Sequence, residues 1–237
     1  MKTVHFVRHG ETEQNKDGIW QGHTNTQLSK TGKAQAKLLS KRINLKNQTV
    51  FTSDLARAKE TAYFLSDSPN VRENLREINV GDFTGKSVKE TYSNNLEIFD
   101  ALQHDTYVFP NGESVQEFKL RVQKEVDHIF DNIDEDSECV VVTHGFFIGT
   151  AIGLVLGFNQ YPYPIGNIQN TSISTVIKRD SVMQVNKFND AIHLPNSYID
   201  YPAKDKSRIL TFIRHGQTDS NTQGVWQGHV DNPLNTY

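Results

Sequence analysis

A segment of 28 residues near the start of the chain recurs 206 positions further on. Residues 4–31 and 210–237 align without a gap, and 12 of the 28 positions are identical. A repeat decides how a chain divides, because each copy belongs to its own structural unit. Residues 196–207 precede the second copy and are typical of a linker. We therefore predict a full domain over residues 1–202, followed over residues 203–237 by a truncated repeat of its N-terminal segment.

Composition and charge exclude several classes of protein. Lys and Arg number 25 against 28 Asp and Glu, the net charge is −3, and no basic field suited to nucleic acid is present. The longest apolar stretch, residues 146–158, has 13 residues and is too short to cross a bilayer. The first ten residues are too polar for a signal or transit peptide. With its single cysteine, the chain has no disulfide framework, and we expect a cytoplasmic protein without nucleic-acid or membrane partners.

Short apolar runs alternate with stretches of helical spacing. Strands are predicted over Thr3–Val7, Thr49–Thr52 and Cys139–Thr143, and a hairpin near one sheet edge over Ser172–Lys178 and Val182–Phe188. Helices are predicted after Ser29, over Leu55–Leu65, from Ser114 and over Phe146–Leu156, and a loop over residues 8–30. This alternation is typical of a largely parallel sheet covered on both faces. The prediction is an α/β fold, a three-layer α/β/α sandwich with a mostly parallel central sheet.

Two of these helices have clear signals in the sequence. Ser114 and Glu117 match a capping box, in which each side chain bonds the backbone N–H of the other residue. The apolar residues that then recur at spacings of three and four are Val115, Phe118, Val122, Val126, Ile129 and Ile133. In the helix after Ser29, the apolar residues near helical spacing are Ala34, Leu38 and Ile43.

Three of the predicted strands end in charged or titratable residues. The residues that follow them are Arg8-His9-Gly10, Asp54 and Arg57, and His144-Gly145. In open α/β sheets, ligands bind beyond the carboxyl ends of the strands. If the three strands are neighbours, two arginines and two histidines meet in one crevice. Each residue alone is more simply a hydrogen-bonded or solvated loop residue, but their coincidence favours a functional site.

Five motifs in a fixed order carry a family resemblance. They are RHGET at 8–12, SDLARAKET at 53–61, LREINVGDFTG at 75–85, PNGES at 110–114 and VVTHG at 141–145, together with Asn15 and Gln21-Gly22. Over residues 1–190 the chain resembles the histidine phosphatase superfamily, and most closely its phosphoglycerate-mutase-like phosphatases. The resemblance implies a phosphoglycerate-mutase-like fold and a phosphoric monoester hydrolase of the histidine acid phosphatase type.

The resemblance also implies roles for individual residues. It makes His9 the nucleophile that becomes phosphorylated and Glu77 the proton donor. The residues that it places around the phosphate are Arg8, Arg57, His144 and Gly145, and the further phosphate or substrate contacts are Asn15, Gln21 and Gly22. It implies no cofactor. No Asp, Glu and His cluster has the spacing of metal ligands, so we also expect no metal.

These residue types suit phosphoryl transfer, because a phosphate monoester is a dianion whose transfer is catalysed mainly by positioning and charge neutralisation. Two guanidinium groups supply that charge at any working pH. The neutral imidazole of His9 is a competent nucleophile if a backbone carbonyl of the 8–12 turn holds its other nitrogen. We expect His144 to be a cation that donates to the phosphate, and Glu77 to protonate the leaving group through a raised pKa. Weaker candidates for the proton donor are Glu11, Asp54 and Asp82.

A phosphatase and a mutase of this family share the first half-reaction and differ in whether water reaches the phosphohistidine. True mutases have a longer insertion between the glutamate and the second histidine, whereas Glu77 and His144 are only 67 positions apart. We favour a phosphatase acting on a small phosphorylated metabolite over a bisphosphoglycerate-dependent phosphoglycerate mutase. A non-catalytic phosphate-binding module is a second alternative, against which the intact set of site residues argues. Residues 86–109 are expected to cap the pocket, with Tyr92, Phe99, Tyr107 and Phe109 as walls or, above all for Phe99, as ordinary core.

The second copy departs from the family pattern. It repeats Arg214-His215-Gly216, Asn221 and Trp226-Gln227-Gly228 but has no counterpart of Arg57, Glu77 or His144. His215 should therefore be inert alone. Residues 209–213 keep an apolar strand pattern, which leaves three alternatives: pairing with a sheet edge, a domain-swapped homodimer, or a loosely attached remnant.

Overall fold

The structure, a computed structural model, describes residues 1–43, 48–94, 106–158, 167–195 and 215–236. The chain divides into two compact units, Met1–Asp200 and Tyr201–Tyr237. The predicted linker at 196–207 and the apolar run at 209–213 lie outside the described residues. Among the described helices, none is both long and apolar enough to span a membrane.

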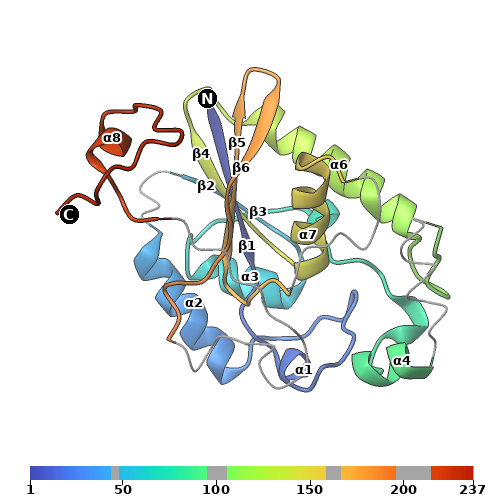
Figure 1. Ribbon diagram of the computed structural model, residues 1–237. Coiled ribbons are helices and arrows are strands. Elements are labelled where there is room, and N and C mark those ends of the chain that lie inside the picture. Colours follow the sequence, from blue (N-terminus) through green and yellow to red (C-terminus); the bar gives the residue numbers. More distant parts are fainter. Residues whose placement is uncertain (44–47, 95–105, 159–166, 196–214, 237) are drawn as a thin grey trace. The chain divides into compact units, whose positions relative to one another are not determined.

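The first unit is built on a six-stranded sheet (Figure 1). Its strands are β1 (Lys2–Arg8), β2 (Thr49–Thr52), β3 (Asn70–Val71), β4 (Glu138–Thr143), β5 (Ile173–Arg179) and β6 (Val182–Asp190). The spatial order is β3-β2-β4-β1-β5-β6, in which β3, β2, β4 and β1 run parallel, while β5 is antiparallel to both β1 and β6. The mostly parallel sheet and the edge hairpin predicted from the sequence are confirmed.

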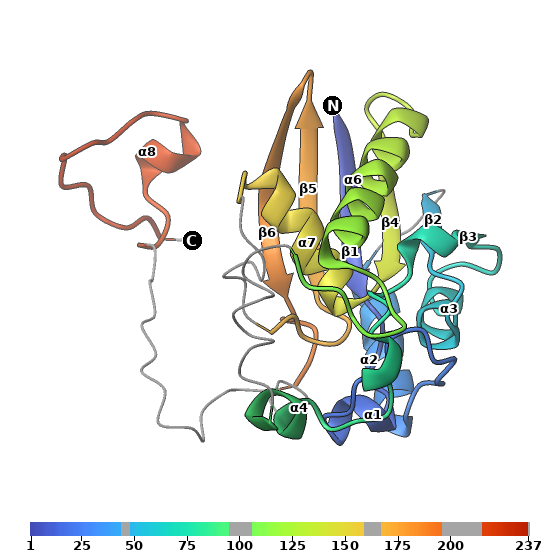
Figure 2. The ribbon, with the colours of Figure 1, turned by 90° about the vertical axis from the view of Figure 1, so that its right-hand side faces the viewer.

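Helices cover both faces of this sheet (Figure 2). They are α2 (Lys30–Arg42) and α3 (Ala56–Tyr63) on one face, and α6 (Val115–Asn132) and α7 (Gly145–Val155) on the other. The connections contain the short helices α1 (Glu13–Lys16) and α4 (Val88–Asn94) and the 3₁₀ turns η1 (Glu73–Leu75) and η2 (Gly81–Phe83). The predicted three-layer α/β/α sandwich is therefore confirmed.

Alternation along β4 explains how one strand supplies both cores. Cys139 and Val141 belong to the cluster under α6 and α7, whereas Val140 and Val142 belong to the cluster under α2 and α3. Successive side chains of a strand point to opposite faces, so a strand covered on both sides is a continuous apolar run. The whole of the predicted run Cys139–Thr143 is buried accordingly.

Helix α6 begins as its sequence predicts. Ser114 Oγ accepts from the backbone N–H of Glu117 at 3.1 Å, and Glu117 Oε2 accepts from the N–H of Ser114 at 3.0 Å. The cap satisfies N–H groups that have no partner within the helix. All six apolar residues of the predicted stripe, from Val115 to Ile133, are buried.

Helix α2 buries a different face from the one that its apolar spacing marks. Ala34 and Leu38 keep some accessible surface. The buried residues are Gly32, Gln35, Ala36 and Leu39. A Cβ on Gly32 would lie 2.0 Å from the carbonyl oxygen of Glu11, and Gln35 Oε1 accepts from the N–H of Glu11 at 2.9 Å. Contact with the loop after β1 therefore sets the orientation of this helix, and apolar spacing cannot show such a contact.

The small unit reproduces the conformation of the loop that follows β1. Thr12 and Asn15 form a capping box around α1, so the predicted loop at 8–30 contains a short helix. Thr218 and Asn221 form the same capping box around α8 (Asp219–Thr222). The loop conformation is thus encoded locally, because it forms in both units.

A side-chain pair that differs between the two copies keeps its hydrogen bond. Ser29 Oγ donates to Glu11 Oε1 at 2.7 Å in the large unit. At the matching positions of the small unit, Asn235 Nδ2 donates to Gln217 Oε1 at 3.0 Å. Both partners have changed type together, and the contact that closes the loop remains.

The two copies differ in how their apolar side chains are packed. Trp20 is 7% exposed, and its ring lies 6.2 Å from that of Phe109 and 5.9 Å from that of Phe146 between centroids. Trp226, at the matching position, is fully exposed. The loop therefore folds from local sequence, while burial of its tryptophan depends on groups from the body of the large unit.

Candidate active site at the carboxyl ends of three strands

The carboxyl ends of β1, β2 and β4 lie side by side, because β4 is between the other two in the sheet. His9 follows β1, Ser53 follows β2 and His144 follows β4. The imidazole rings of His9 and His144 are 5.1 Å apart between centroids and inclined at 60°. The three strands are thus the neighbours that a common crevice requires.

His9 is held as a neutral imidazole. Its Nδ1–H donates to the carbonyl oxygen of Gly10 at 2.7 Å, which leaves the lone pair on Nε2. The side chain is 3% exposed. Burial, followed by the charges of Arg57 and Arg8, lowers its pKa well below the ordinary histidine value. The carbonyl that orients this ring lies in the 8–12 turn, where the sequence predicts it.

The backbone around His9 is fixed by three neighbouring elements. The N–H of His9 donates to the carbonyl oxygen of Thr143 at the end of β4 at 2.9 Å. The N–H of Gly10 donates to Thr61 Oγ1 on α3, also at 2.9 Å. Asn170 Nδ2, just before β5, donates to the carbonyl oxygen of His9 at 2.9 Å. The imidazole is therefore mounted on a turn with little freedom to shift.

Arg57 is a buried guanidinium in the first turn of α3. Its Nη1 donates to the carbonyl oxygen of Thr24 at 2.7 Å and its Nη2 to that of Gly22 at 2.8 Å. Its Nε is buried and has no hydrogen-bond partner among the described residues, although buried polar groups normally have one. Burial lowers the pKa of Arg57 to about 10, so the group stays charged at neutral pH. This remaining N–H suits an oxygen atom of an anion.

Arg8 ends β1 and lies against the start of α7. Its Nη1 donates to the carbonyl oxygen of Ile168. A Cβ placed on Gly145 would lie 3.5 Å from Arg8 Nε, an ordinary van der Waals distance, so the guanidinium lies directly against the first residue of α7. The charges of Arg8 and Arg57 lower the pKa of both His9 and His144. The four side chains therefore share one electrostatic environment.

His144 is fully buried, and its Nε2 lies 2.9 Å from Ser53 Oγ. Ser53 Oγ accepts from the N–H of Leu55 at 3.3 Å, which leaves the hydroxyl proton available to His144 Nε2. When the hydroxyl donates to Nε2, the ring proton of a neutral His144 is on Nδ1. That Nδ1 is buried and has no hydrogen-bond partner in the described part of the chain. In the tautomer with its proton on Nδ1, it is a second donor suited to an anion.

In the protein without a bound anion the ring of His144 favours its neutral form, whereas the expected cation that donates to a bound phosphate stays a prediction. Burial, and then the charges of Arg57, His9 and Arg8, lower its pKa well below the ordinary value. A phosphate would favour the cation, whereas burial beside two guanidinium groups favours the neutral ring, and residue spacing does not reveal that burial. In the tautomer with its proton on Nδ1, a neutral His144 still donates one hydrogen bond, so its predicted position beside a phosphate needs no charge.

The carboxyl group of Glu77 contacts the N-terminus of α7. Oε1 accepts from the N–H of Ile78 at 3.0 Å, and Oε2 accepts from the N–H of Phe146 at 3.2 Å. Burial raises its pKa, and these hydrogen bonds and the charges of Arg57 and Arg8 offset part of the rise. A raised pKa allows a carboxylic acid to hold its proton closer to neutral pH.

The three weaker candidates for the proton donor are engaged elsewhere or exposed. Glu11 accepts from Ser29 Oγ at the start of α2. Asp54 forms an ion pair with Arg76, which lowers its pKa and keeps it deprotonated. Asp82 is exposed. Of the four carboxyl groups, that of Glu77 is therefore the best suited to carry a proton.

Asn15, Gln21 and Gly22 order the loop beside the two imidazoles. Asn15 completes the capping box with Thr12. Gln21 Oε1 accepts from the hydroxyls of Thr12 and Thr26 at 3.1 and 2.7 Å. Gly22 has a φ of +48°, which glycine adopts without strain, and its carbonyl accepts from the buried guanidinium on α3. Direct contacts of these three residues with phosphate or substrate stay a prediction.

Four residues that fix the site were not singled out from the sequence. They are Ser53, Thr61 and Asn170, whose contacts are given above, and Arg121, which donates to the carbonyl oxygens of Asn74, Arg76 and Glu77. Ser53 directly follows a predicted strand, so the strand-end rule that selected Asp54 could have included it. Asn170 and Arg121 have no comparable local signal, because their partners are distant in sequence.

Much of the predicted cap lies outside the described residues. Phe99 is within the undescribed range 95–105, and the side chain of Tyr92 is not described either. Phe109 is 1% exposed, and its ring lies 4.9 Å from that of Tyr107 and 5.7 Å from that of Phe83 between centroids. Of the two alternatives predicted for Phe109, a wall of the pocket or ordinary core, the structure shows core packing. Among the described residues, no group of three or more His, Cys, Asp or Glu side chains could hold a metal ion.

Fold and site together define an α/β protein in which two buried histidines and two arginines meet at the carboxyl ends of adjacent strands. The chain belongs to the histidine phosphatase superfamily (branch 1), whose family model matches residues 4–191 and again residues 210–237. The resemblance in the sequence is thereby confirmed. The second match falls on the repeat, although it does not test the predicted boundary between residues 202 and 203.

Relatives of the chain include proteins named as phosphatases and as mutases. It is 30% identical over 199 residues to a metal-independent phosphoserine phosphatase of Arabidopsis thaliana, covering 80% of this chain and 82% of the relative. It is 28% identical over 213 residues to a "probable phosphoglycerate mutase GpmB" of Enterobacter sp. (strain 638), covering 87% and 99%. A solved structure of a phosphoserine phosphatase variant from Entamoeba histolytica, in complex with phosphoserine, is 27% identical with a TM-score of 0.71, covering 82% and 100%.

Proposed function

We propose that the protein is a phosphomonoesterase that acts on a small phosphorylated metabolite through a phosphohistidine intermediate. The proposal rests on one observation: the ring of a neutral His9, with its lone pair on Nε2, lies 5.1 Å between centroids from that of His144, and buried ring and guanidinium nitrogens of His144 and Arg57 have no hydrogen-bond partner in the described part of the chain. A nucleophile and an anion receptor are thus held together, as phosphoryl transfer requires. Membership of the family and the names of relatives support the same class of reaction.

In the first step, Nε2 of His9 attacks phosphorus and the bond to the ester oxygen breaks. Arg8, Arg57 and the Nδ1–H of His144 stabilise the charge on the transferred group. Glu77, whose pKa is raised by burial, gives its proton to the leaving alkoxide in its acid form. The products of this step are an alcohol and phosphohistidine.

In the second step, water attacks the phosphorus atom of the phosphohistidine. Glu77, now a carboxylate, accepts a proton from that water and is restored to its acid form. The P–N bond breaks, its electron pair returns to Nε2 of His9, and inorganic phosphate leaves. The cycle closes with every group in its starting state.

Turnover of p-nitrophenyl phosphate, in EDTA and without added bisphosphoglycerate, is expected to release phosphate at a catalytic rate. The reason is that two guanidinium groups supply the positive charge and water completes the cycle. Turnover that depends on the bisphosphate would instead support the mutase alternative, which the name of the Enterobacter relative favours. Phosphate binding without turnover under either condition would support the non-catalytic module. Activity lost in EDTA and restored by a divalent cation would contradict a metal-independent mechanism.

We further propose that residues 1–202 form the catalytic domain, in a cytoplasmic protein, and that residues 203–237 contribute no catalytic group. Removing residues 203–237 is then expected to leave kcat/KM unchanged, because no counterpart of Glu77 or His144 accompanies His215 in the repeat. Steady-state kinetics and the solution mass of both proteins provide the measurement. A mass that falls from dimer to monomer on truncation would favour the domain-swapped homodimer, and a loss of kcat/KM would contradict the proposal.

A further inference from the structure

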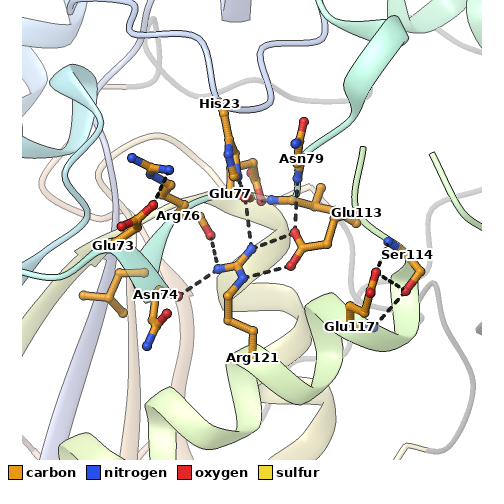
Figure 3. Close-up of polar contacts among 12 residues, drawn as sticks. His23, Glu73, Asn74, Arg76, Glu77, Asn79, Glu113, Ser114, Glu117 and Arg121 are labelled. Carbon is orange, nitrogen blue, oxygen red and sulfur yellow. Dashed lines mark hydrogen bonds and ion pairs between the residues drawn. The ribbon is translucent and has the colours of Figure 1, made fainter. Parts of the chain in front are cut away.

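The backbone that leads to Glu77 is held by a guanidinium from outside the site (Figure 3). Arg121 lies on α6, and its Nη1 donates to the carbonyl oxygens of Asn74 at 2.8 Å and Arg76 at 2.9 Å. Its Nη2 donates to the carbonyl oxygen of Glu77 at 3.2 Å. One side chain therefore contacts three carbonyls in the four residues that end at Glu77.

The other N–H groups of Arg121 bind a carboxylate that extends the same network. Nε and Nη2 donate to Glu113 Oε1 and Oε2 at 2.9 and 2.8 Å. Glu113 Oε2 also accepts from the N–H of Asn79 at 3.2 Å, and the N–H of Glu113 donates to the carbonyl oxygen of Asn79 at 2.9 Å. The Arg121–Glu113 pair thus fixes the backbone before Glu77 and after it.

The remaining polar contacts tie this segment to the site itself. The carbonyl oxygen of Glu77 also accepts from His23 Nε2 at 2.8 Å, and His23 lies in the loop that contains Gln21 and Gly22. The carbonyl oxygen of Leu75 accepts from Thr143 Oγ1, at the end of β4, at 2.7 Å. Every carbonyl from residue 74 to residue 77 is therefore hydrogen-bonded, and Arg121 supplies three of these bonds.

Arginine is the only side chain that can make this set of contacts. A guanidinium has five N–H donors in a planar fork, and all five donate here, whereas a lysine ammonium has three. The two side chains of the pair are 19% and 15% exposed, so solvent only partly weakens their attraction. The guanidinium carbon also lies 5.0 Å from the ring centroid of Phe118 on the same helix. The fork is thus held in one orientation.

We propose that Arg121, paired with Glu113, is a positioning residue that aims the carboxyl group of Glu77 at the leaving-group oxygen. The proposal rests on the proposed function, because it assigns Arg121 to the proton-transfer step of that reaction. Arg121 does not touch substrate; it acts through the backbone of the 74–79 segment. A misplacement of about 1 Å in a catalytic group can cost on the order of a hundredfold in rate.

The test compares Arg121→Lys with the unchanged protein on two substrates of similar shape, phenyl phosphate and p-nitrophenyl phosphate. Phenoxide is a strong enough base to need a proton from the enzyme as it leaves. The weaker base p-nitrophenoxide leaves with little such help. We expect kcat/KM on phenyl phosphate to fall by about 10- to 100-fold, part of the usual worth of a general acid, and to fall far less on p-nitrophenyl phosphate. If loss of the fork also exposes Glu77 to water, the pKa of Glu77 falls, because burial is what raises it. The alkaline limb of the pH profile of kcat/KM on phenyl phosphate then moves to lower pH.

Arg72→Lys is the matched control. Arg72 pairs with the buried Glu125 on the same helix, next to the same 3₁₀ turn, but it bonds no carbonyl of the 74–77 segment in the contacts that the structure describes. Its ratio of rates on the two substrates should match that of the unchanged protein. If Arg121→Lys does not fold, the same comparison of kcat/KM on phenyl phosphate and p-nitrophenyl phosphate is made with Glu113→Gln, and the same selective loss is expected.

An equal loss on both substrates, or no loss on either, would overturn the positioning role. Equal loss would indicate a purely structural contribution, since proton transfer matters unequally for the two leaving groups. If the unchanged protein hydrolyses neither substrate, the proposed function fails first, and the role of Arg121 falls with it. The two failures are therefore distinguishable.

Discussion

Replacing His9 with alanine is expected to abolish the covalent uptake of phosphate by the protein. Because Nδ1 of His9 is bonded to the carbonyl oxygen of Gly10, Nε2 carries the lone pair that attacks phosphorus. Alanine supplies no nucleophile in its place. Catalytic turnover should fall to the background rate, because both half-reactions pass through the phosphohistidine. Rapid quenching with labelled substrate, followed by mass spectrometry under conditions that preserve phosphohistidine, measures the phosphoenzyme directly.

The chain contains its own control for this experiment. His215 has the same Arg-His-Gly sequence, and its Nδ1 lies 2.7 Å from the carbonyl oxygen of Gly216, as His9 Nδ1 does from Gly10. His215→Ala should leave the phosphoenzyme at its normal level, because the orienting hydrogen bond alone does not make a site. A His9→Ala protein that still takes up one phosphoryl group per chain would contradict the nucleophile assignment.

Sequence alone could predict the strands of this fold because burial on two faces leaves a direct trace. The run Cys139–Thr143 is apolar throughout since its alternate residues enter different cores. The order of the strands leaves no such trace. Two of the pairings that form the site, β2 with β4 and β4 with β1, join segments far apart in the chain, and only the structure shows them.

The parts of the site that sequence reasoning missed act through distant or buried contacts. Arg121 reaches Asn74 across 47 positions, and Asn170 reaches His9 across 161, so neither position has a local pattern that marks it. The charge state of His144 depends on its burial, which spacing does not reveal. A motif identifies residues that belong to the site, whereas the protonation and orientation of their side chains depend on the surroundings.

Replacing Glu77 with glutamine is expected to lower kcat/KM on phenyl phosphate by about 10²- to 10⁴-fold, the usual worth of a general acid. Glutamine keeps the size of the side chain and can still accept from the N–H of Ile78 or Phe146, so the fold should survive. It has no proton to give to the leaving oxygen at the operating pH. The value of kcat/KM on p-nitrophenyl phosphate should fall much less, because it reports the step that releases the leaving group, and that leaving group needs little protonation.

The pH profile assigns this loss to proton transfer. Burial raises the pKa of Glu77, so the acid form persists to higher pH than for an ordinary glutamate, and the rate on phenyl phosphate falls as pH rises through that pKa. The depressed pKa of His9 places the loss of its lone pair at lower pH than for an ordinary histidine. Glu77→Gln should therefore lose the alkaline limb and keep the acidic one. Because both proteins are measured on the same substrate, ionisation of the phosphate cancels between them, and an unchanged alkaline limb in the glutamine variant would assign the proton to another group.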